Sequence, residues 1–137
     1  MNVIRCARIA MIGLLASLAG FGVTRAQTIQ CSGAQQPWMV AELLFGRGRV
    51  SEASWTRFLG SEITPRFPDG LTVYDAKGQW RPPGSQTIIR ESTKVVMIAM
   101  PPGAENDSRL QQVITAYKRR FDQKSVGLIV RPACVSF

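Results

Sequence analysis

The residues best suited to chemistry lie in two short segments, one after a predicted helix and one around a predicted hairpin. Arg66 and Asp69 belong to the first segment, and Trp80, Arg90 and Glu91 belong to the second. Arginine side chains bind anions and tryptophan offers an apolar face, so the group would suit an anion or a small ligand. We expect these five residues to lie close together near one end of the sheet. The structural alternative is a tight turn in which Asp69 accepts backbone hydrogen bonds and Arg66 pairs with Asp69 or Glu91.

Catalytic motifs are lacking. The 137 residues include no histidine, which excludes a Ser-His-Asp triad, a Cys-His pair and any zinc site with an imidazole ligand. Nine scattered acidic residues define no carboxylate pair for glycoside hydrolysis. Ser92 and Lys94 share one face of a predicted strand, but a Ser-Lys dyad would need a desolvated lysine. We therefore assign no catalytic residue, no metal site and no cofactor.

A basic loop, residues 46–49, is a second candidate for anion binding because it runs into a predicted helix N-terminus at Ser51. The loop lacks the spacing and the Lys-Ser/Thr ending of a phosphate-binding loop. A solvated loop is the favoured interpretation.

The first 26 residues have the pattern of a secretory signal peptide. Arg5 and Arg8 precede an uncharged apolar run over residues 9–23, and Thr24-Arg25-Ala26 resembles a cleavage site. A membrane span needs about 20 apolar residues, which disfavours an uncleaved anchor. We expect a periplasmic or secreted product that is not inserted in a membrane after cleavage.

Cleavage would change the charge and the cysteine count. The 17 basic residues less Arg5, Arg8 and Arg25 leave 14, against 9 acidic residues, so the mature net charge is +5. This balance falls short of a nucleic-acid-binding stripe, and we expect no nucleic-acid partner. Two cysteines remain, Cys31 and Cys134, and an even number in an oxidising compartment predicts one disulfide.

The mature chain reads as a polar lead-in, residues 27–37, followed by one α+β domain, residues 38–137. Ser51 is a good helix N-cap, and Gly78 suggests a β-bulge in the second strand. Apolar periodicity and turn residues predict the other elements. These are strands at 38–45, 71–75, 87–100 and 126–131, a helix from Ser51 to Pro65, a type II turn at 82–85, and a second helix beginning between Glu105 and Asp107.

The order strand-helix-strand-strand-helix-strand is that of the split β-α-β, or ferredoxin-like, fold. Right-handed crossovers place both helices on one face of a four-stranded antiparallel sheet. The first and last strands are neighbours in this topology, so Cys31 and Cys134 meet at one end. The fold thus predicts the same disulfide as the cysteine count.

The other face of the sheet is predicted to need a cover. Residues 95–100 are apolar at every position, which is typical of a strand buried on both sides. An exposed apolar sheet commonly marks a partner or a second subunit, and a dimer packed sheet to sheet is the simplest candidate. The alternative is that residues 27–37 and 132–137 fold back over this face.

The chain also resembles a bacterial protein family. The residues that carry the resemblance are 50–55 (VSEASW), 64–73 (TPRFPDGLTV), 78–81 (GQWR), 89–95 (IRESTKV) and 132–137 (PACVSF). On these motifs the sequence is similar to domain of unknown function 3574, a family of small exported proteins of Gram-negative bacteria. The resemblance implies export and a compact α+β domain, and it brings no activity.

Two functions from different classes remain open. The first is a non-catalytic binding module that holds a second copy, an envelope protein or a small ligand on the open sheet face. The second is an enzyme or ligand carrier of the dimeric α/β-barrel kind, with a pocket between sheet and helices. Ferredoxin-like domains host many activities, so the fold does not choose between them. A dry cavity lined by Met39, Tyr74 and Met97 would favour the second, and a solid core the first.

Overall fold

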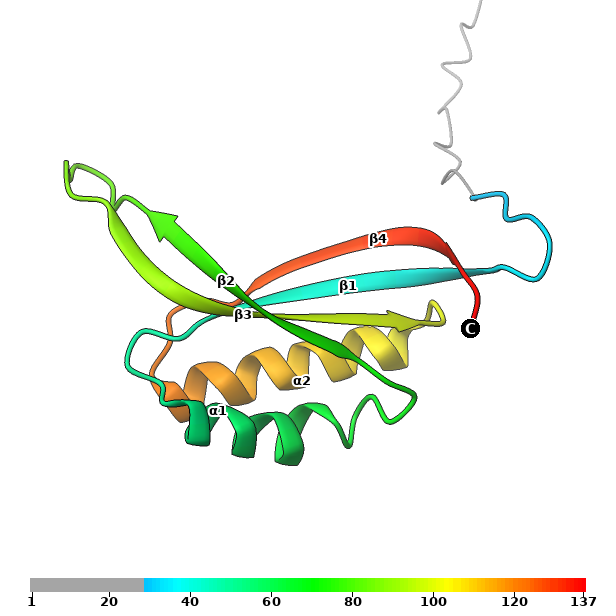
Figure 1. The fold of residues 1–137 in the computed structure, drawn as a ribbon, viewed down its shortest axis with the longest axis horizontal. Helices are drawn as coiled ribbons and strands as arrows, with labels where there is room; N and C mark the ends of the chain where they lie inside the picture. The colour runs from blue at the N-terminus through cyan, green and yellow to red at the C-terminus, as the bar shows by residue number, and fades with distance from the viewer. Residues whose placement is uncertain (1–28) are drawn as a thin grey trace, which may run out of the picture.

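The computed structural model of the protein describes residues 29–137, and the predicted signal peptide lies outside them. The elements follow the predicted order along the chain (Figure 1). They are β1 (Gln36–Gly46), α1 (Glu52–Phe58), a short π-helix η1 (Leu59–Ile63), β2 (Thr72–Trp80), β3 (Ile89–Met100), α2 (Ala104–Phe121) and β4 (Gly127–Val135).

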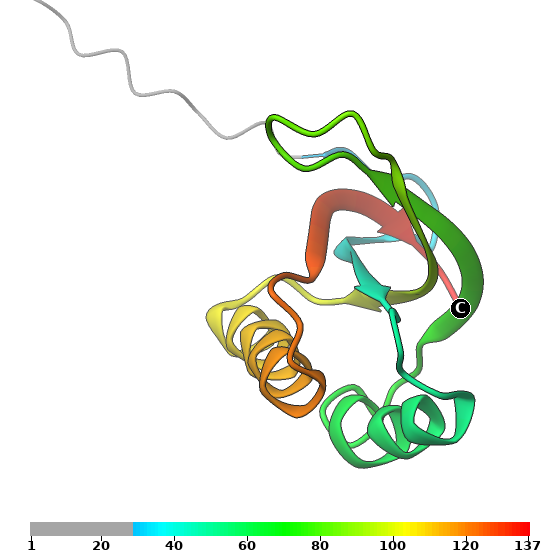
Figure 2. The same cartoon turned by 90° about the vertical axis from the view of Figure 1, so that its left-hand side faces the viewer.

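The four strands form one antiparallel sheet in the order β2-β3-β1-β4. Both helices lie against the same face of this sheet, and the opposite face carries no helix of the described chain (Figures 1 and 2). This arrangement confirms the predicted ferredoxin-like α+β fold.

The first helix begins where the sequence predicts and departs from α geometry near its end. The Ser51 hydroxyl accepts a hydrogen bond from the Ser54 amide at 3.2 Å, which satisfies one of the free donors of the first turn. From Leu59 to Ile63 the chain widens into a π-helix. Phe58 and Ile63 are five residues apart, a spacing that a helix of 3.6 residues per turn places on different faces. The wider turn allows both side chains to be fully buried.

The core between sheet and helices is filled by aromatic side chains. Phe45 on β1 lies 4.7 Å from Tyr117 and 5.3 Å from Trp55, measured between ring centroids. Phe58 lies 5.1 Å from Tyr117, and none of these four residues is more than 2% exposed. The Tyr117 hydroxyl donates a hydrogen bond to the Gly46 carbonyl at 3.0 Å, which ties α2 to the end of β1.

The β2–β3 hairpin is longer than the rest of the sheet. Strand β1 ends at Gly46 opposite Thr93, so residues 77–92 continue as a two-stranded ribbon, here called the arm. Figure 1 shows the arm rising from the sheet on the side away from the helices. The predicted turn at its tip is confirmed: the Ser85 amide donates to the Pro82 carbonyl at 3.1 Å, and Gly84 has φ +74°.

The predicted bulge at Gly78 is wrong. Strands β2 and β3 pair one to one from Thr72 and Met97 to Trp80 and Ile89, and Gly78 lies opposite Glu91 within this register. Glycine is required there for space instead, because a Cβ atom would lie 2.9 Å from the Thr93 hydroxyl.

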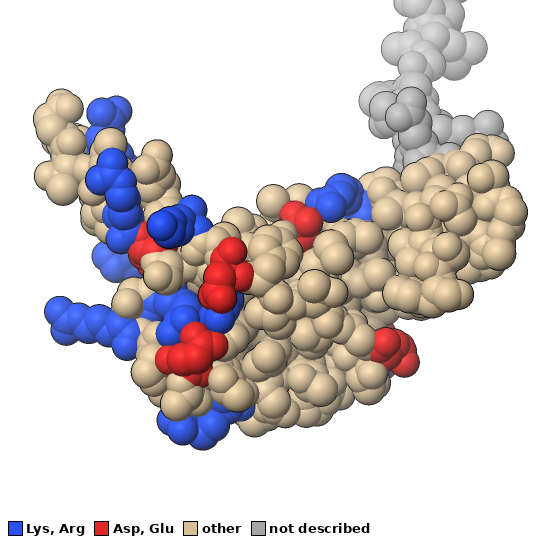
Figure 3. All heavy atoms as spheres, in the orientation of Figure 1, with Lys and Arg blue, Asp and Glu red and all other residues tan. Residues whose placement is uncertain are grey.

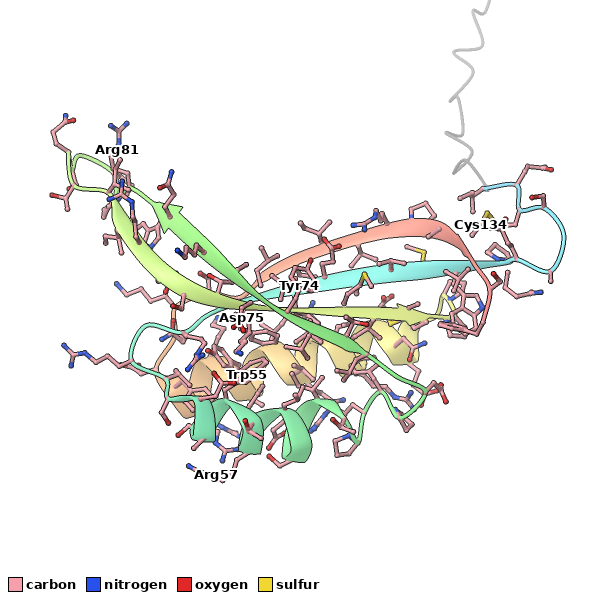
Figure 4. The ribbon with its side chains drawn as sticks, in the orientation of Figure 1. Trp55, Arg57, Tyr74, Asp75, Arg81 and Cys134 are labelled. Carbon is pink, nitrogen blue, oxygen red and sulfur yellow. A yellow bond between two sulfur atoms is a disulfide. The ribbon has the colours of Figure 1, made fainter. Side chains whose placement is uncertain are left out.

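The two ends of the described chain are joined at the far end of the sheet from the arm. Strand β1 begins at Gln36 and β4 extends to Val135, which places Pro37 opposite Cys134. Cys31 and Cys134 form a disulfide with their Cα atoms 5.4 Å apart (Figure 4). The pairing predicted from the topology and the cysteine count is therefore confirmed.

Candidate functional site

The structure separates the five residues predicted to form one site. Arg66 and Asp69 precede the start of β2, whereas Trp80, Arg90 and Glu91 lie in the arm at its other end. The expectation that they share one end of the sheet is wrong. Strand β2 pairs with β3 without a break through the predicted bulge position, and a strand advances about 3.3 Å for each residue. The continuous nine-residue strand thus holds the two groups apart.

Arg66 is a structural residue of the first helical segment. Its guanidinium donates to the Glu62 carbonyl at 2.6 Å and forms an ion pair with the Glu62 carboxylate at 3.0 Å. The predicted pairing of Arg66 with Asp69 or Glu91 is therefore wrong, since the helical spacing to Glu62 offers a nearer carboxylate. In the described chain, the turn containing Asp69 is closed by the Gly70 amide and the Phe67 carbonyl, and the Asp69 side chain bonds to no backbone amide.

Trp80 and Glu91 do meet, on the walls of a groove at the base of the arm. The groove has a volume of about 700 Å³ and lies between the arm and the loop from α2 to β4. Most of its lining residues on the strands belong to the face away from the helices. They are Leu44, Gly46, Ala76, Gly78, Trp80, Glu91, Thr93 and Gly127, and the exceptions are Lys77 and Gln79 on β2, which alternate with them.

Glu91 rests on a glycine at the floor of this groove. A Cβ atom on Gly46 would lie 2.6 Å from one carboxylate oxygen of Glu91 and 2.8 Å from the other, so the close approach depends on glycine. Among residues 29–137 the Glu91 carboxylate forms no ion pair, which leaves it available to a ligand. Burial raises the pKa of the nearby Tyr117 to about 12, with Arg47 opposing the shift and Glu91 adding to it.

A charge network beneath the groove was missed by the sequence analysis. Lys94 is 7% exposed and forms ion pairs with Asp75 at 2.7 Å and with Glu52 at 3.0 Å. Glu52 also pairs with Arg47, whose guanidinium donates to the Val50 carbonyl as well. The signal in the sequence was Lys94 itself. It is a charged residue on the same strand face as the buried Val96 and Ile98.

This network decides against two candidate sites. The hydrogen bonds that Lys94 donates to Asp75 and Glu52 raise the pKa of Lys94, and its burial opposes this shift, whereas a Ser-Lys dyad requires a lysine that loses its proton easily. In the basic loop, Arg47 is occupied by Glu52 and by Val50, so its guanidinium already has partners within the chain.

We expect the network to give stability a defined pH window. The pKa of Glu52 is lowered from 4.5, chiefly by its hydrogen bond with Lys94, and the pKa of Lys94 is raised from 10.5. The contribution of Glu52 is present above pH 4.5 and is lost as the pH falls through its lowered pKa. The contribution of Lys94 is complete below pH 10.5 and is lost as the pH rises through its raised pKa.

Lys94→Met should therefore flatten both limbs of the curve of unfolding free energy against pH, measured by urea denaturation. Lys118→Met, at an exposed lysine of α2, is the matched control and should keep both limbs. An unchanged pH profile in Lys94→Met would show that the network does not stabilise the fold.

The sheet face away from the helices, called the open face from here on, is only partly covered. The ring of the C-terminal Phe137 lies 5.7 Å from that of Trp38 but stays fully exposed, and the two rings border a hollow with Met97 and Ala99. Toward the arm, Tyr74 is 44% exposed and Ile129 is 48% exposed. The predicted cover by the chain ends is thus limited to one end of the face. Residues 29–35 extend beyond the sheet (Figure 1).

The middle of the open face carries one ion pair. Glu42 on β1 accepts from Arg131 on β4 at 3.1 Å, and this hydrogen bond raises the pKa of Arg131. Within the described residues, no three His, Cys, Asp or Glu side chains gather as metal ligands. None of the helices in residues 29–137 combines the length and the apolar character needed to cross a membrane.

Solved structures share this fold at low sequence identity. A phage SAM lyase in complex with S-methyl-5'-thioadenosine has a TM-score of 0.54 and 12% identity over 82% of this chain and 97% of its own. CutA1 from Oryza sativa has a TM-score of 0.53 and 12% identity over 77% of this chain and 87% of its own. At such identity the likeness shows the fold alone. No curated protein matches the chain.

The family, in contrast, is established by sequence. Residues 40–137 match the family model described as "Protein of unknown function (DUF3574)", which spans nearly all of the described chain. The match confirms the resemblance carried by the motifs between Val50 and Phe137. The chain belongs to the DUF3574 family.

Proposed function

We propose that the protein is an exported, non-catalytic binding module that holds a protein partner on its open face. The observation that carries this proposal is a sheet with one face packed against helices and the other exposing Tyr74 and Ile129. Exposed apolar side chains on a sheet face favour association, because burying them removes apolar surface from water. The signal-peptide pattern and the disulfide support a periplasmic or secreted location.

A second copy of the chain is the partner that we propose first. In the body of the sheet the open face is mostly apolar, and its charges Glu42 and Arg131 pair within one copy, whereas Glu91, which forms no ion pair among residues 29–137, lies in the arm. Two such faces related by a twofold axis can pack without burying an unpaired charge. An envelope protein with a matching apolar surface is the alternative partner.

The enzyme or carrier alternative gains no support from the core. Its expected cavity would join Met39, Tyr74 and Met97, but Met39 packs against the helix-side core whereas Tyr74 and Met97 lie on the open face. Aromatic rings fill the space between sheet and helices instead. The groove near Trp80 and Glu91, on the open face, is therefore where we would expect a small ligand to bind.

The proposal is tested by two substitutions at neighbouring positions of β4. Ile129 points to the open face, and Val130 points to the helix side while remaining 41% exposed. In sedimentation velocity we expect a dimer for the unreduced wild type and for Val130→Glu, and a monomer for Ile129→Glu. The reason is that a buried unpaired carboxylate in the interface costs several kcal/mol.

Other outcomes decide between the partners or reject the proposal. A monomeric wild type that co-purifies with an envelope protein, and loses it in Ile129→Glu but not in Val130→Glu, would identify that protein as the partner. The proposal would be contradicted by a monomeric wild type that binds no protein whose association is lost in Ile129→Glu.

A further inference from the structure

The tip of the arm exposes apolar side chains that nothing in the described chain covers. Trp80 is 51% exposed, Ile88 46% and Ile89 38%, and Trp80 pairs with Ile89 as the last residue pair of the ribbon. An isolated two-stranded ribbon is at best marginally stable in water, so an arm of this kind benefits from a surface to bind. Residues 81–88, which include Ile88, continue beyond this pair as the loop at the end of the arm.

The arm is also mainly basic. Residues 77–92 contain Lys77, Arg81 and Arg90 and one acidic residue, Glu91, which lies in the groove at the base of the arm. Blue Lys and Arg atoms gather on the arm and on the same end of the molecule in Figure 3. Figure 4 places Arg81 at the arm tip, and Arg57 beyond α1 on the opposite side of the molecule. The charge of the tip is thus complementary to an anionic surface.

The backbone of the tip suits a weakly hydrated environment. Pro82 and Pro83 carry no amide hydrogen, so two backbone donors are missing at the turn. The amides of Ser85 and Thr87 donate to the Pro82 carbonyl and to the Ser85 hydroxyl. Fewer free donors lower the cost of moving the turn out of bulk water.

We propose that the arm tip binds the surface of a bilayer that contains anionic phospholipids. Trp80, Ile88 and Ile89 enter the boundary between headgroups and acyl chains, and Arg81 and Arg90 remain at the level of the phosphates. Lys77, further from the tip, adds long-range attraction to the same headgroups. The protein then lies on the membrane through a peripheral contact and does not cross it.

The shape of the tip favours a bilayer over an acidic protein as the occupant. The ribbon is narrow and projects freely (Figure 1). Trp80 and Ile89 form its last residue pair, and Arg90 belongs to the next pair toward the sheet. A fluid lipid surface can surround such a projection, whereas a protein partner would need a matching cavity. The proposal does not depend on the open-face interface, because Tyr74 and Ile129 lie in the body of the sheet.

Co-sedimentation of the processed, unreduced protein with vesicles tests the proposal. We expect binding to phosphatidylcholine vesicles that contain phosphatidylglycerol and little binding to phosphatidylcholine alone. Arg81→Gln should lower the partition coefficient about five-fold, since each basic residue near an anionic surface contributes about this factor. Ile88→Ser combined with Ile89→Ser should lower it roughly ten-fold or more, because two apolar side chains no longer leave water.

Matched controls use exposed residues away from the arm. Arg57→Gln removes one positive charge, and Val130→Ser removes one exposed apolar side chain, and neither should change vesicle binding. Ile129→Glu should keep the preference for phosphatidylglycerol vesicles and the loss on Arg81→Gln, even if loss of the dimer weakens binding overall, which separates this proposal from the open-face interface. Equal binding of the wild type to both vesicle types would overturn the proposal, as would equal losses in Arg57→Gln and Arg81→Gln. Vesicle binding that is undiminished in the double isoleucine variant would overturn it too. Soluble polyglutamate carries negative charge without a bilayer, so binding to it that survives in this variant would indicate an acidic partner instead.

Discussion

Phe58→Ala should lower the free energy of unfolding by about 3–5 kcal/mol, the range for removing a buried aromatic side chain. Phe58, the last residue of α1, is fully buried against α2. Its ring centroid lies 5.1 Å from that of Tyr117 and 5.6 Å from that of Phe121. Rigid rings on several sides prevent the core from collapsing into the space, so the cost lies near the top of that range. The total free energy of unfolding of a domain of this size is about 5–15 kcal/mol, so the loss is a large part of it.

The change is measured by urea denaturation, with Phe137→Ala as the matched control. Phe137 is fully exposed, so its loss should change the free energy by about 0.5 kcal/mol or less. If the two variants were equally stable, the aromatic cluster would not be the core of the fold.

Replacing both cysteines, Cys31→Ser with Cys134→Ser, should lower the free energy of unfolding by about 2–4 kcal/mol. The disulfide spans a sequence separation of 103 residues, and its removal frees the unfolded chain from a large closed loop. It also releases the junction between the start of β1 and the end of β4, where Pro37 lies opposite Cys134. Thermal unfolding of the double variant beside the oxidised wild type measures the effect.

The wild type unfolded in the presence of a reductant is the control for the substitutions themselves. Reduction should shift the wild-type transition to that of the double variant and leave the double variant unchanged. A wild-type transition that does not respond to complete reduction would contradict a stabilising disulfide.

Elements whose ends are set by local chemistry were predictable from the sequence. Ser51 caps α1 because its hydroxyl satisfies a backbone donor, and Pro83 with Gly84 forms the type II turn because both have the required backbone angles. The disulfide followed from the cysteine count and from the ferredoxin-like topology, in which β1 and β4 are antiparallel neighbours and bring Cys31 beside Cys134. Each of these features depends on a few adjacent residues or on a general rule of chain connection.

Features that depend on tertiary contacts were not predictable. The π-helix at Leu59–Ile63 arises because Phe58 and Ile63 both enter the core, and the periodic pattern of a regular α-helix also fits those residues. Gly78 serves a close approach to Thr93, which cannot be distinguished from a bulge by residue type alone. The five candidate residues were also misplaced, since the unbroken length of β2 separates Arg66, before its start, from Glu91, which pairs near its end.

The central claim is that the open face of the sheet holds a protein partner. The most direct test is native mass spectrometry of the processed, unreduced protein purified from its own cell envelope. We predict a complex of two copies, each with the mass loss of one disulfide, or one copy bound to a single envelope protein. A bare monomer, recovered under conditions in which known envelope complexes survive, would contradict the claim.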